Sequence, residues 1–339
     1  MLGNRKTYSQ NAGYSCISEK MGEVDSKDIS VIVQGAIDSI NTKSCLSSIR
    51  KYLPNAEIIL STWKNSNISN LDFDILLEND DPGYSYYQNP KDYPETKVNN
   101  VNRQIVSTIN ALKYSTKKYS LKIRTDFEIC SNDFLKYFDK YNLRDERLSI
   151  FKRRIFITSW LTTHSFFPCD WVQFGLTKDL IKLFDIPLMS TADSEYFYYK
   201  AFKNKKEKNI FDKCNSQLRY FPEQHIFYSC FKNNYYDIGY KDFLNDTKII
   251  QSISEEILLD NFAILESNIF YIKPLKSSLN QAYNILTDNS IYKKYKNCWI
   301  NNHIYNDLYE EKYIKHKKPV SNYIKNKIIN LYLKEKNYD

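Results

Sequence analysis

The chain has 339 residues, more than one typical compact domain, and 42% of them are hydrophobic, which is enough for a substantial core. Its net charge is +8, but much of the excess comes from lysines after Lys312. Seven cysteines without a C-x-x-C pair and four widely spaced histidines argue against a disulfide framework and a structural zinc site.

Composition also bears on where the protein works. The many tyrosines and phenylalanines reflect a compositional bias more than a stacking platform, so we expect no nucleic-acid partner. The sequence has neither the cationic start and apolar core of a signal peptide nor an apolar run near the ~20 residues that span a bilayer. We therefore expect a soluble, cytoplasmic protein.

Strands and helices alternate in the first half of the chain, after a polar N-terminal extension at residues 1–28. Strands are predicted at 29–33, 57–63, 73–78 and 121–129. Helices are predicted from Thr42 to Leu53 and from Asn99 or Asn100 to Leu112. This order predicts an α/β fold with a mostly parallel sheet flanked by helices. The segment 84–98 is predicted to be a long functional or mobile loop.

Beyond residue 130 the pattern is less regular. Helices are predicted at 133–141, at 177–184 and from Pro222, and a strand at 148–153. Residues 155–167 fit neither pattern, and 186–216 are predicted to be a solvated loop. After residue 245 the pattern becomes helical, at 253–261, at 279–286 and from Val320. We predict a main domain at 29–245 and a helical, basic C-terminal region at 246–339.

The last predicted helix is amphipathic. Val320, Ile324 and Ile328 share one side of it, and Lys325 and Lys327 lie around them. Such a helix could adsorb to an anionic membrane surface. It could equally dock on the main domain with its lysines in water. Both interpretations remain open at this stage.

The segment 121–129 concentrates polar chemistry at the end of a predicted strand. Arg124, Asp126 and Glu128 alternate, so an extended backbone would place all three side chains on one face, where ligands of α/β sheets collect. The two carboxylates could share a divalent cation, and Arg124 could bind a phosphate or carboxylate. The alternative is a surface strand whose ion pair contributes almost nothing.

Two common nucleotide motifs are missing. The turn after the first strand contains only Gly35 and no G-x-G-x-x-G, and the sequence contains no P-loop. This removes the commonest dehydrogenase and NTPase interpretations.

Several segments together resemble the WavE family of bacterial lipopolysaccharide and capsule biosynthesis proteins. The resemblance is carried by ISVIVQG at 29–35, SIRKYLPNAEIILSTW at 48–63, DDPG at 80–83, NNVNRQIVS at 99–107 and KIRTD at 122–126, and less firmly by DWVQFG at 170–175 and PEQ at 222–224. It implies a glycosyltransferase-like protein with a GT-A type fold, whose catalytic domain would be 29–245.

The resemblance implies a donor site over the strand ends. The side chains expected to contact a nucleotide sugar are Gln34, Gly35, Ser61, Trp63, Asn79, Asp81, Arg103, Arg124 and Asp126. GT-A enzymes commonly carry Asp-x-Asp at this strand end, and Arg124 replaces the first carboxylate here. A divalent metal, Mg²⁺ or Mn²⁺, could bind Asp126 alone or with Glu128, or Arg124 could do part of its work. Trp63 could instead be a packing residue, and Asp81 a turn former.

Two carboxylates are candidates for the acceptor side of the reaction. If transfer inverts the anomeric centre, a base must take the proton of the acceptor hydroxyl, and Glu223 is the first choice. Its alternative role is to complement the dipole of the helix that starts at Pro222. Asp170 is the second choice, as base or acceptor contact, or else a cap or turn residue. His164 and His225 are expected to be structural.

The predicted function is therefore transfer of a sugar from a nucleotide-sugar donor to a growing lipopolysaccharide, lipooligosaccharide or capsule glycan. The partners would be the nucleotide sugar, a glycan or lipid-linked glycan acceptor, and the inner face of the inner membrane. The alternative is a non-catalytic glycan- or partner-binding subunit of the assembly machinery on the same fold. A nucleotidyltransferase is a third reading, but the turn after the first strand matches its usual Gly- and Lys/Arg-rich loop poorly.

Overall fold

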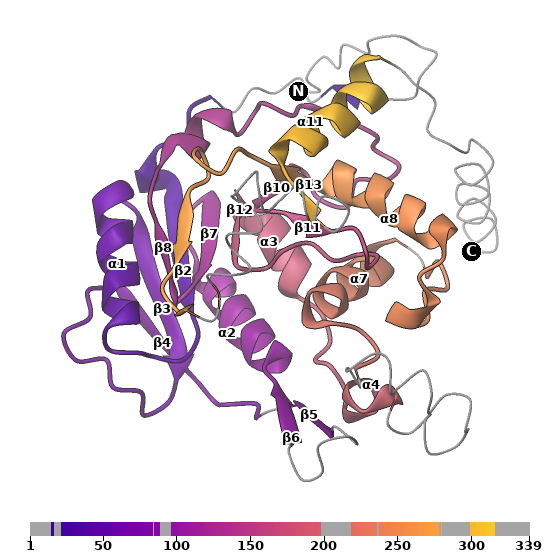
Figure 1. Cartoon of the computed structure of the whole chain (residues 1–339). Helices are drawn as coiled ribbons and strands as arrows, with labels where there is room; N and C mark the ends of the chain where they lie inside the picture. The colour runs from indigo at the N-terminus through magenta and orange to yellow at the C-terminus, as the bar shows by residue number, and fades with distance from the viewer. Residues whose placement is uncertain are drawn as a thin grey trace, which may run out of the picture.

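A seven-stranded sheet lies at the centre of the computed structural model, which describes residues 15–16, 22–83, 85–88, 96–197, 218–235, 237–277, 279 and 299–315 (Figure 1). In spatial order the strands are β13 (Phe262–Ile264), β10 (Ile155–Ile157), β12 (Val172–Leu176), β7 (Tyr119–Arg124), β2 (Ile29–Gln34), β3 (Glu57–Trp63) and β4 (Ile75–Asn79). Within this sheet β12 runs against its neighbours β7 and β10, whereas the other neighbouring pairs are parallel. The predicted α/β fold with a mostly parallel sheet is confirmed.

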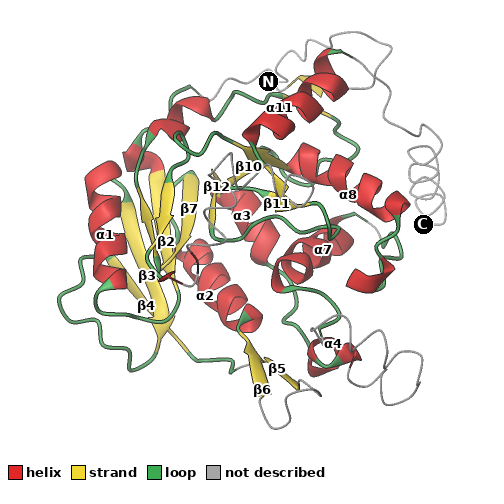
Figure 2. Ribbon diagram, in the orientation of Figure 1, coloured by secondary structure: helices red, strands yellow, loops and turns green. Residues whose placement is uncertain are grey.

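Helices cover both faces of this sheet. Helix α1 (Asn41–Tyr52) lies on one face, while α2 (Val101–Tyr114) and α3 (Thr177–Phe184) lie on the other (Figure 2). Every residue of β2 is buried, which is why its sequence is apolar without alternation. Strand β4 begins at Ile75, two residues later than the strand predicted at 73–78. The Asp74 carboxylate accepts a hydrogen bond from the Ile58 amide at 2.7 Å and also pairs with Arg50.

The predicted strand 148–153 is wrong. The amides of Ile150 and Phe151 donate to the Asn261 side chain, and those of Lys152 and Arg153 donate to the Asp179 carboxylate. Side chains from α8 (Lys248–Asn261) and α3 therefore satisfy the backbone groups that a strand would have paired. The neighbouring strand β10 falls in the segment that fitted neither pattern. The predicted helix 133–141 is only a short 3-10 helix, η2 (Asp133–Tyr137).

Three other segments contain secondary structure that the sequence predicted only in part or not at all. The predicted loop 84–98 contains the antiparallel pair β5 (Ser85–Gln88) and β6 (Thr96–Asn99). The predicted solvated loop contains α4 (Thr191–Ser194), and α7 (Pro222–Asn234) starts at the proline as predicted. Of the N-terminal extension, β1 (Ser15–Cys16) pairs with β9 (Leu143–Arg144), and η1 (Ser26–Asp28) precedes β2.

The single strand predicted at 121–129 is broken in two. Strand β7 ends at Arg124, and β8 (Phe127–Ile129) pairs with β14 (Ile272–Pro274) outside the central sheet. The break occurs because the Thr125 amide donates to the Gln34 carbonyl at 3.1 Å and the Thr125 hydroxyl donates to the Ala36 carbonyl at 2.9 Å. Arg124, Asp126 and Glu128 therefore do not share one extended face, and that expectation is wrong.

The C-terminal region contributes to the core more than expected. It supplies α8 (Lys248–Asn261), which contains the predicted helix 253–261, but also the sheet strand β13, as well as β14, β15 (Trp299–Ile300), α11 (Asn302–Tyr309) and the π-helical turn η4 (Glu310–Ile314). The predicted helix from Val320 lies outside the described residues, as does nearly all of 279–286. Among the described helices, none is both long and apolar enough to cross a membrane.

A buried ionic cluster fastens this region to the sheet. The Asp260 carboxylate at the end of α8 accepts hydrogen bonds from the Asp145 amide at 2.8 Å, from the Lys312 ammonium at 2.5 Å and from the Tyr313 hydroxyl. The Arg154 guanidinium lies 3.7 Å from the same carboxylate. Because buried charges are tolerated only when paired, this carboxylate is needed to hold the cations inside.

We expect Asp260→Ala to lower the free energy of unfolding by about 3–5 kcal/mol, because the Lys312 ammonium would stay buried without its partner. Urea unfolding followed by circular dichroism measures this loss. Asp307→Ala is the control, since Asp307 is exposed and lies 3.8 Å from the exposed His303. Its effect should stay within about 0.5 kcal/mol. Equal effects of the two substitutions would contradict this role of Asp260.

Candidate functional site

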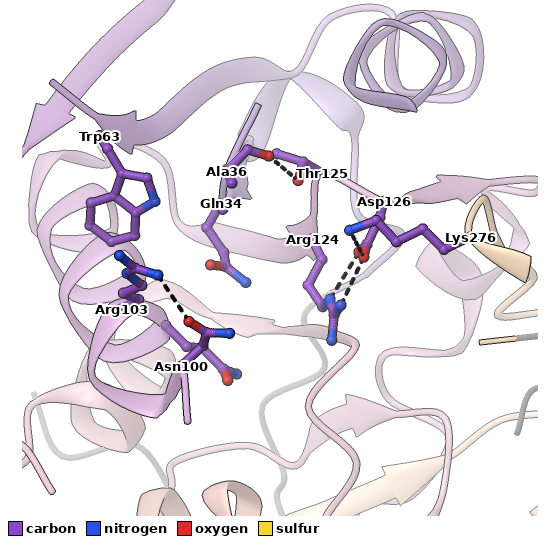
Figure 3. A pocket seen from close by; sticks show the side chains of 11 residues that line it. Gln34, Ala36, Trp63, Asn100, Arg103, Arg124, Thr125, Asp126 and Lys276 are labelled. Carbon is purple, nitrogen blue, oxygen red and sulfur yellow. Dashed lines mark hydrogen bonds and ion pairs between the residues drawn. The ribbon is translucent and has the colours of Figure 1, made fainter. Parts of the chain in front are cut away.

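A pocket of about 430 Å³ opens where β2, β3 and β7 end and α2 begins (Figure 3). It is lined by Gln34, Gly35, Ala36, Trp63, Asn100, Arg103, Gln104, Arg124, Thr125, Asp126 and Lys276. The chain leaves β2 toward β3 on one side and later returns to β7 on the other side. Such a reversal of strand order leaves a crevice at the carboxyl ends of the strands, the usual ligand position in α/β sheets.

The pocket floor is a close approach of two strand ends. Gly35 has φ of +130°, and a Cβ atom there would lie 3.1 Å from the Thr125 hydroxyl oxygen. Glycine is suited to both constraints because it lacks a Cβ atom and adopts positive φ readily. The sequence expectation that Gly35 belongs to the site thus corresponds to a steric requirement at its floor.

The pocket wall carries more positive than negative charge. Arg103, Arg124 and Lys276 line it against the single carboxylate of Asp126. The first turn of α2 also faces the pocket through Arg103 and Gln104, and a helix N-terminus carries partial positive charge. This arrangement fits an anionic ligand such as a phosphate or diphosphate.

Arg124 and Asp126 form a two-pronged ion pair across the Thr125 turn. Arg124 donates from Nε to one carboxylate oxygen at 2.9 Å and from Nη2 to the other at 2.8 Å, and the Lys276 Nζ lies 3.1 Å from the latter oxygen (Figure 3). Burial would raise the pKa of Asp126, but hydrogen bonds and charge from Arg124, together with Lys276, hold that pKa below its usual value. Asp126 is therefore a carboxylate that orients cations.

The residues present do not fit a divalent-metal site. Both oxygens of Asp126 already accept from cationic groups. Glu128, the second candidate ligand, lines a different hollow beside α1, because the chain turns between the two residues. No group of three or more side chains suited to bind a metal occurs within the described residues. The expectation that Glu128 joins Asp126 is therefore wrong.

Arg103 is held in place from behind. Its Nε donates to Asp81 at 2.7 Å, its Nη2 also donates to Asp81, and its Nη1 donates to Asn100 at 3.2 Å. The guanidinium lies 6.0 Å from the centre of the Trp63 ring, within cation–π range. Trp63 stands on the pocket wall, as Figure 3 shows, whereas Asp81 does not line the pocket and instead orients Arg103.

Ser61 and Asn79, two of the side chains expected to contact a nucleotide sugar, are not among the residues that line the pocket. Both are buried; Asn79 donates to the Ser61 hydroxyl at 2.9 Å, and that hydroxyl donates to the Ser107 carbonyl at 2.7 Å. Their polar groups are used to fix α2 on the strand ends. Ser107 in turn donates to the Gln34 side-chain oxygen at 3.0 Å, which orients the Gln34 amide in the pocket.

The two candidate catalytic carboxylates lie beside the cationic pocket. Gln104, which lines the pocket, donates to the Asp170 carboxylate at 2.6 Å. Burial and the negative charge of Asp170 raise the pKa of Glu223 to about 8, against the opposing charges of Arg124 and Lys122. A carboxyl group with a pKa near neutrality is suited to proton transfer.

Three neighbours of these groups were not expected from the sequence. Lys122 is completely buried in β7 and donates to the Asp170 backbone carbonyl. A lysine between Leu121 and Ile123 in a central strand is an unusual feature, and the sequence alone could have drawn attention to it. Gln104 lines the pocket from the first turn of α2, and Lys276 follows β14, so only the fold brings Lys276 to Asp126.

The histidines have structural surroundings. His225 is buried in α7, and its Nε2 lies 3.0 Å from the Pro187 carbonyl. His164 packs edge-on against Phe221, with ring centres 4.9 Å apart. Burial lowers the pKa of both histidines, so both are neutral at neutral pH.

The family can now be stated from comparison with known proteins. The sequence model for WavE lipopolysaccharide synthesis matches residues 29–334. The chain belongs to the WavE lipopolysaccharide synthesis family. The match spans the sheet, the pocket, Glu223 and the C-terminal region, so it extends well beyond the segments that carried the resemblance in the sequence.

Other comparisons add less. No curated protein matches the chain. Among solved structures, 4-diphosphocytidyl-2C-methyl-D-erythritol synthase from Anaerococcus prevotii is 14% identical with a TM-score of 0.29, covering 52% of this chain and 85% of that one. A cytidylyltransferase from Leptospira borgpetersenii is 11% identical with a TM-score of 0.27, covering 53% and 71%. At these TM-scores neither likeness bears on the function of this WavE-family chain.

We expect Asp170→Asn to lower the pKa of Glu223 by about one unit, because the substitution removes a like charge and keeps an oxygen for Gln104. Carbon-13 NMR titration of the glutamate carboxyl groups measures this, with Glu223→Gln to assign the signal. Glu78→Asp, an exposed change on β4, is the control and should leave the pKa of Glu223 unchanged. A wild-type Glu223 that titrates near the ordinary value of 4.5 would contradict the raised pKa attributed to desolvation and to Asp170.

Proposed function

We propose that this WavE-family protein is a glycosyltransferase that moves a sugar from a nucleotide-sugar donor to a hydroxyl of a growing lipopolysaccharide, lipooligosaccharide or capsule glycan. The observation that carries the proposal is the adjacency of two unlike features. A cationic pocket at the strand ends is suited to a sugar-linked phosphate, and a carboxyl pair beside it is suited to an acceptor hydroxyl.

The cationic pocket would stabilise the departing phosphate. Glycosyl transfer passes through an oxocarbenium-like state, in which negative charge grows on the leaving group. Arg103, Arg124 and Lys276 would meet that charge from three directions, with help from the α2 N-terminus. We infer that Arg124 does the work usually given to a metal held by Asp-x-Asp, and that Asp126 keeps Arg124 and Lys276 aligned.

Glu223 would act as the general base. As the acceptor oxygen forms its bond to the anomeric carbon, the bond from that carbon to the phosphate oxygen breaks and the hydroxyl proton passes to Glu223. The phosphate leaves with the electron pair of the broken bond, so charge and protons balance. Asp170, held by Gln104, would position the acceptor and raise the basicity of Glu223.

The rest of the pocket would hold the nucleoside. Trp63 offers a flat ring, and the Gln34 amide is fixed by Ser107 as a hydrogen-bonding group. An acceptor that is lipid-linked would require work at the inner face of the inner membrane, which is where we place this protein.

Nucleotide binding without added metal is the first expected outcome. Among UDP, GDP, CMP and ADP, at least one should raise the melting temperature in the presence of EDTA, since binding stabilises the folded state. Arg124→Met should weaken this binding about tenfold to a hundredfold, because a charge-assisted hydrogen bond to phosphate is lost. Arg103→Met should also weaken nucleotide binding, and this variant provides the test if Arg124→Met folds poorly.

Lys113→Met is the matched control for these substitutions. Lys113 is a half-exposed cation on α2 that pairs with Asp185 and does not line the pocket, so nucleotide binding should be unchanged. If no nucleotide stabilises the folded protein, with or without Mn²⁺, the proposal fails. Binding that appears only with Mn²⁺ would return the metal to the mechanism and contradict the role given to Arg124.

Turnover separates an enzyme from a binding subunit. Slow release of nucleotide from nucleotide sugars, in which water replaces the acceptor, should fall about a hundredfold or more in Glu223→Gln. Wild-type activity should rise with pH through about 8, because Glu223 must be deprotonated to accept a proton. The exposed Glu78→Gln should keep wild-type activity. Tight nucleotide binding without any turnover would favour the non-catalytic subunit.

A further inference from the structure

Aromatic residues stand on the same two chain segments as the carboxylates Asp170 and Glu223. Phe167 precedes Asp170 by three residues, and Phe221 precedes Glu223 by two. The two phenyl rings lie 5.8 Å apart, and His164 lies 4.9 Å from Phe221. We call His164, Phe167 and Phe221 the aromatic patch. The same two segments thus bring together three rings and the carboxylates whose charges interact.

The patch is partly exposed but firmly supported. All three of its side chains are half-buried. Beneath them Phe243, which is only 6% exposed, packs 4.8 Å from Phe221, and Phe197 packs 5.2 Å from Phe243. Rings fixed by such an underlayer lose little freedom when a ligand covers them, which favours binding.

The aromatic patch is uncharged, in contrast to the cationic pocket. Burial lowers the pKa of His164, so the three rings carry no charge at neutral pH. The segments that hold the rings also carry the carboxyl groups of Asp170 and Glu223, whereas the nearby cation Arg219 is paired with Asp193. An anion would be repelled from these carboxylates. A hydrocarbon chain would gain from the rings but would offer the carboxylates no further hydrogen-bond donor in place of water.

A sugar ring satisfies both features. Its C–H face is apolar and packs against aromatic rings, and its hydroxyl groups donate to carboxylate oxygens. We propose that the aromatic patch is a carbohydrate-binding subsite, which seats the terminal sugar of the acceptor with one hydroxyl directed at Glu223. The identity of this sugar as the acceptor rests on the proposed function, whereas its binding does not.

Saturation-transfer difference NMR tests the subsite without turnover. The probes are millimolar methyl hexopyranosides and methyl N-acetylhexosaminides, with octyl glucoside as a probe for alkyl binding. We expect ring C–H protons of at least one methyl glycoside to receive saturation from aromatic protons. Phe167→Leu and Phe221→Leu should each weaken binding about threefold to tenfold, because a flat ring is replaced by a branched aliphatic group.

Two further variants make the result specific. Phe221→Tyr keeps the flat ring and should restore sugar binding, which separates loss of the ring from a folding defect. Tyr114→Leu removes an aromatic ring that is 61% exposed at the end of α2 and should change nothing. No saturation of any methyl glycoside, saturation confined to the octyl chain, or sugar binding unchanged in both leucine variants would each overturn the proposal.

Nucleotide binding is followed in the same samples. Thermal stabilisation by the nucleotide panel should be unaffected in Phe221→Leu, because the patch is separate from the cationic pocket. Sugar binding without nucleotide binding would defeat the proposed transferase and keep the subsite. Nucleotide binding without sugar binding would do the reverse.

Discussion

The ion pair between Arg124 and Asp126 is the constraint on which the rest of the site depends. It spans a turn whose centre, Thr125, is bonded to the carbonyl groups of Gln34 and Ala36 at the end of the neighbouring strand. The turn ends the central strand β7 and sends the chain into β8. It also leaves the Arg124 guanidinium on the pocket wall, where its Nε and Nη2 atoms donate to the two oxygens of the Asp126 carboxylate. A side chain held in this way loses little entropy on meeting a phosphate.

This arrangement separates two kinds of electrostatic work over a short stretch of sheet. On the β2 side, Arg103, Arg124 and Lys276 exceed the one carboxylate that aligns two of them. On the α7 side, burial and the negative charge of Asp170 raise the pKa of Glu223. The buried Lys122 donates to the Asp170 backbone carbonyl, and its charge opposes the rise in the pKa of Glu223. The cationic pocket and the carboxyl pair can then be adjacent without neutralising each other.

The sequence was sufficient for the parts of the fold that rest on local pattern. The apolar run of β2, the amphipathic α1 and α2, and the proline at the start of α7 all gave elements close to those observed. It failed where distant side chains decide. The amides at 150–153 are taken by Asn261 and Asp179, and the break at Thr125 depends on β2, so neither could be seen in the local pattern.

The same distinction holds for the site. The family resemblance placed Gln34, Trp63, Arg103, Arg124 and Asp126 at one site, and all five line the pocket. It did not indicate that Asp81, Ser61 and Asn79 would support the pocket from behind. Lys276 could not be assigned because its position follows from β14 pairing with β8, a contact between segments far apart in sequence. A local sequence pattern cannot predict the role of a residue whose position depends on one tertiary pairing.

The most direct test of the central claim is a crystal structure with the nucleotide that stabilises the protein best, grown in the presence of EDTA. The account predicts phosphate oxygens within hydrogen-bond distance of Arg124 and Arg103, with Asp126 still paired to Arg124. A nucleotide bound elsewhere, or a bound phosphate that does not contact Arg124, would contradict this prediction.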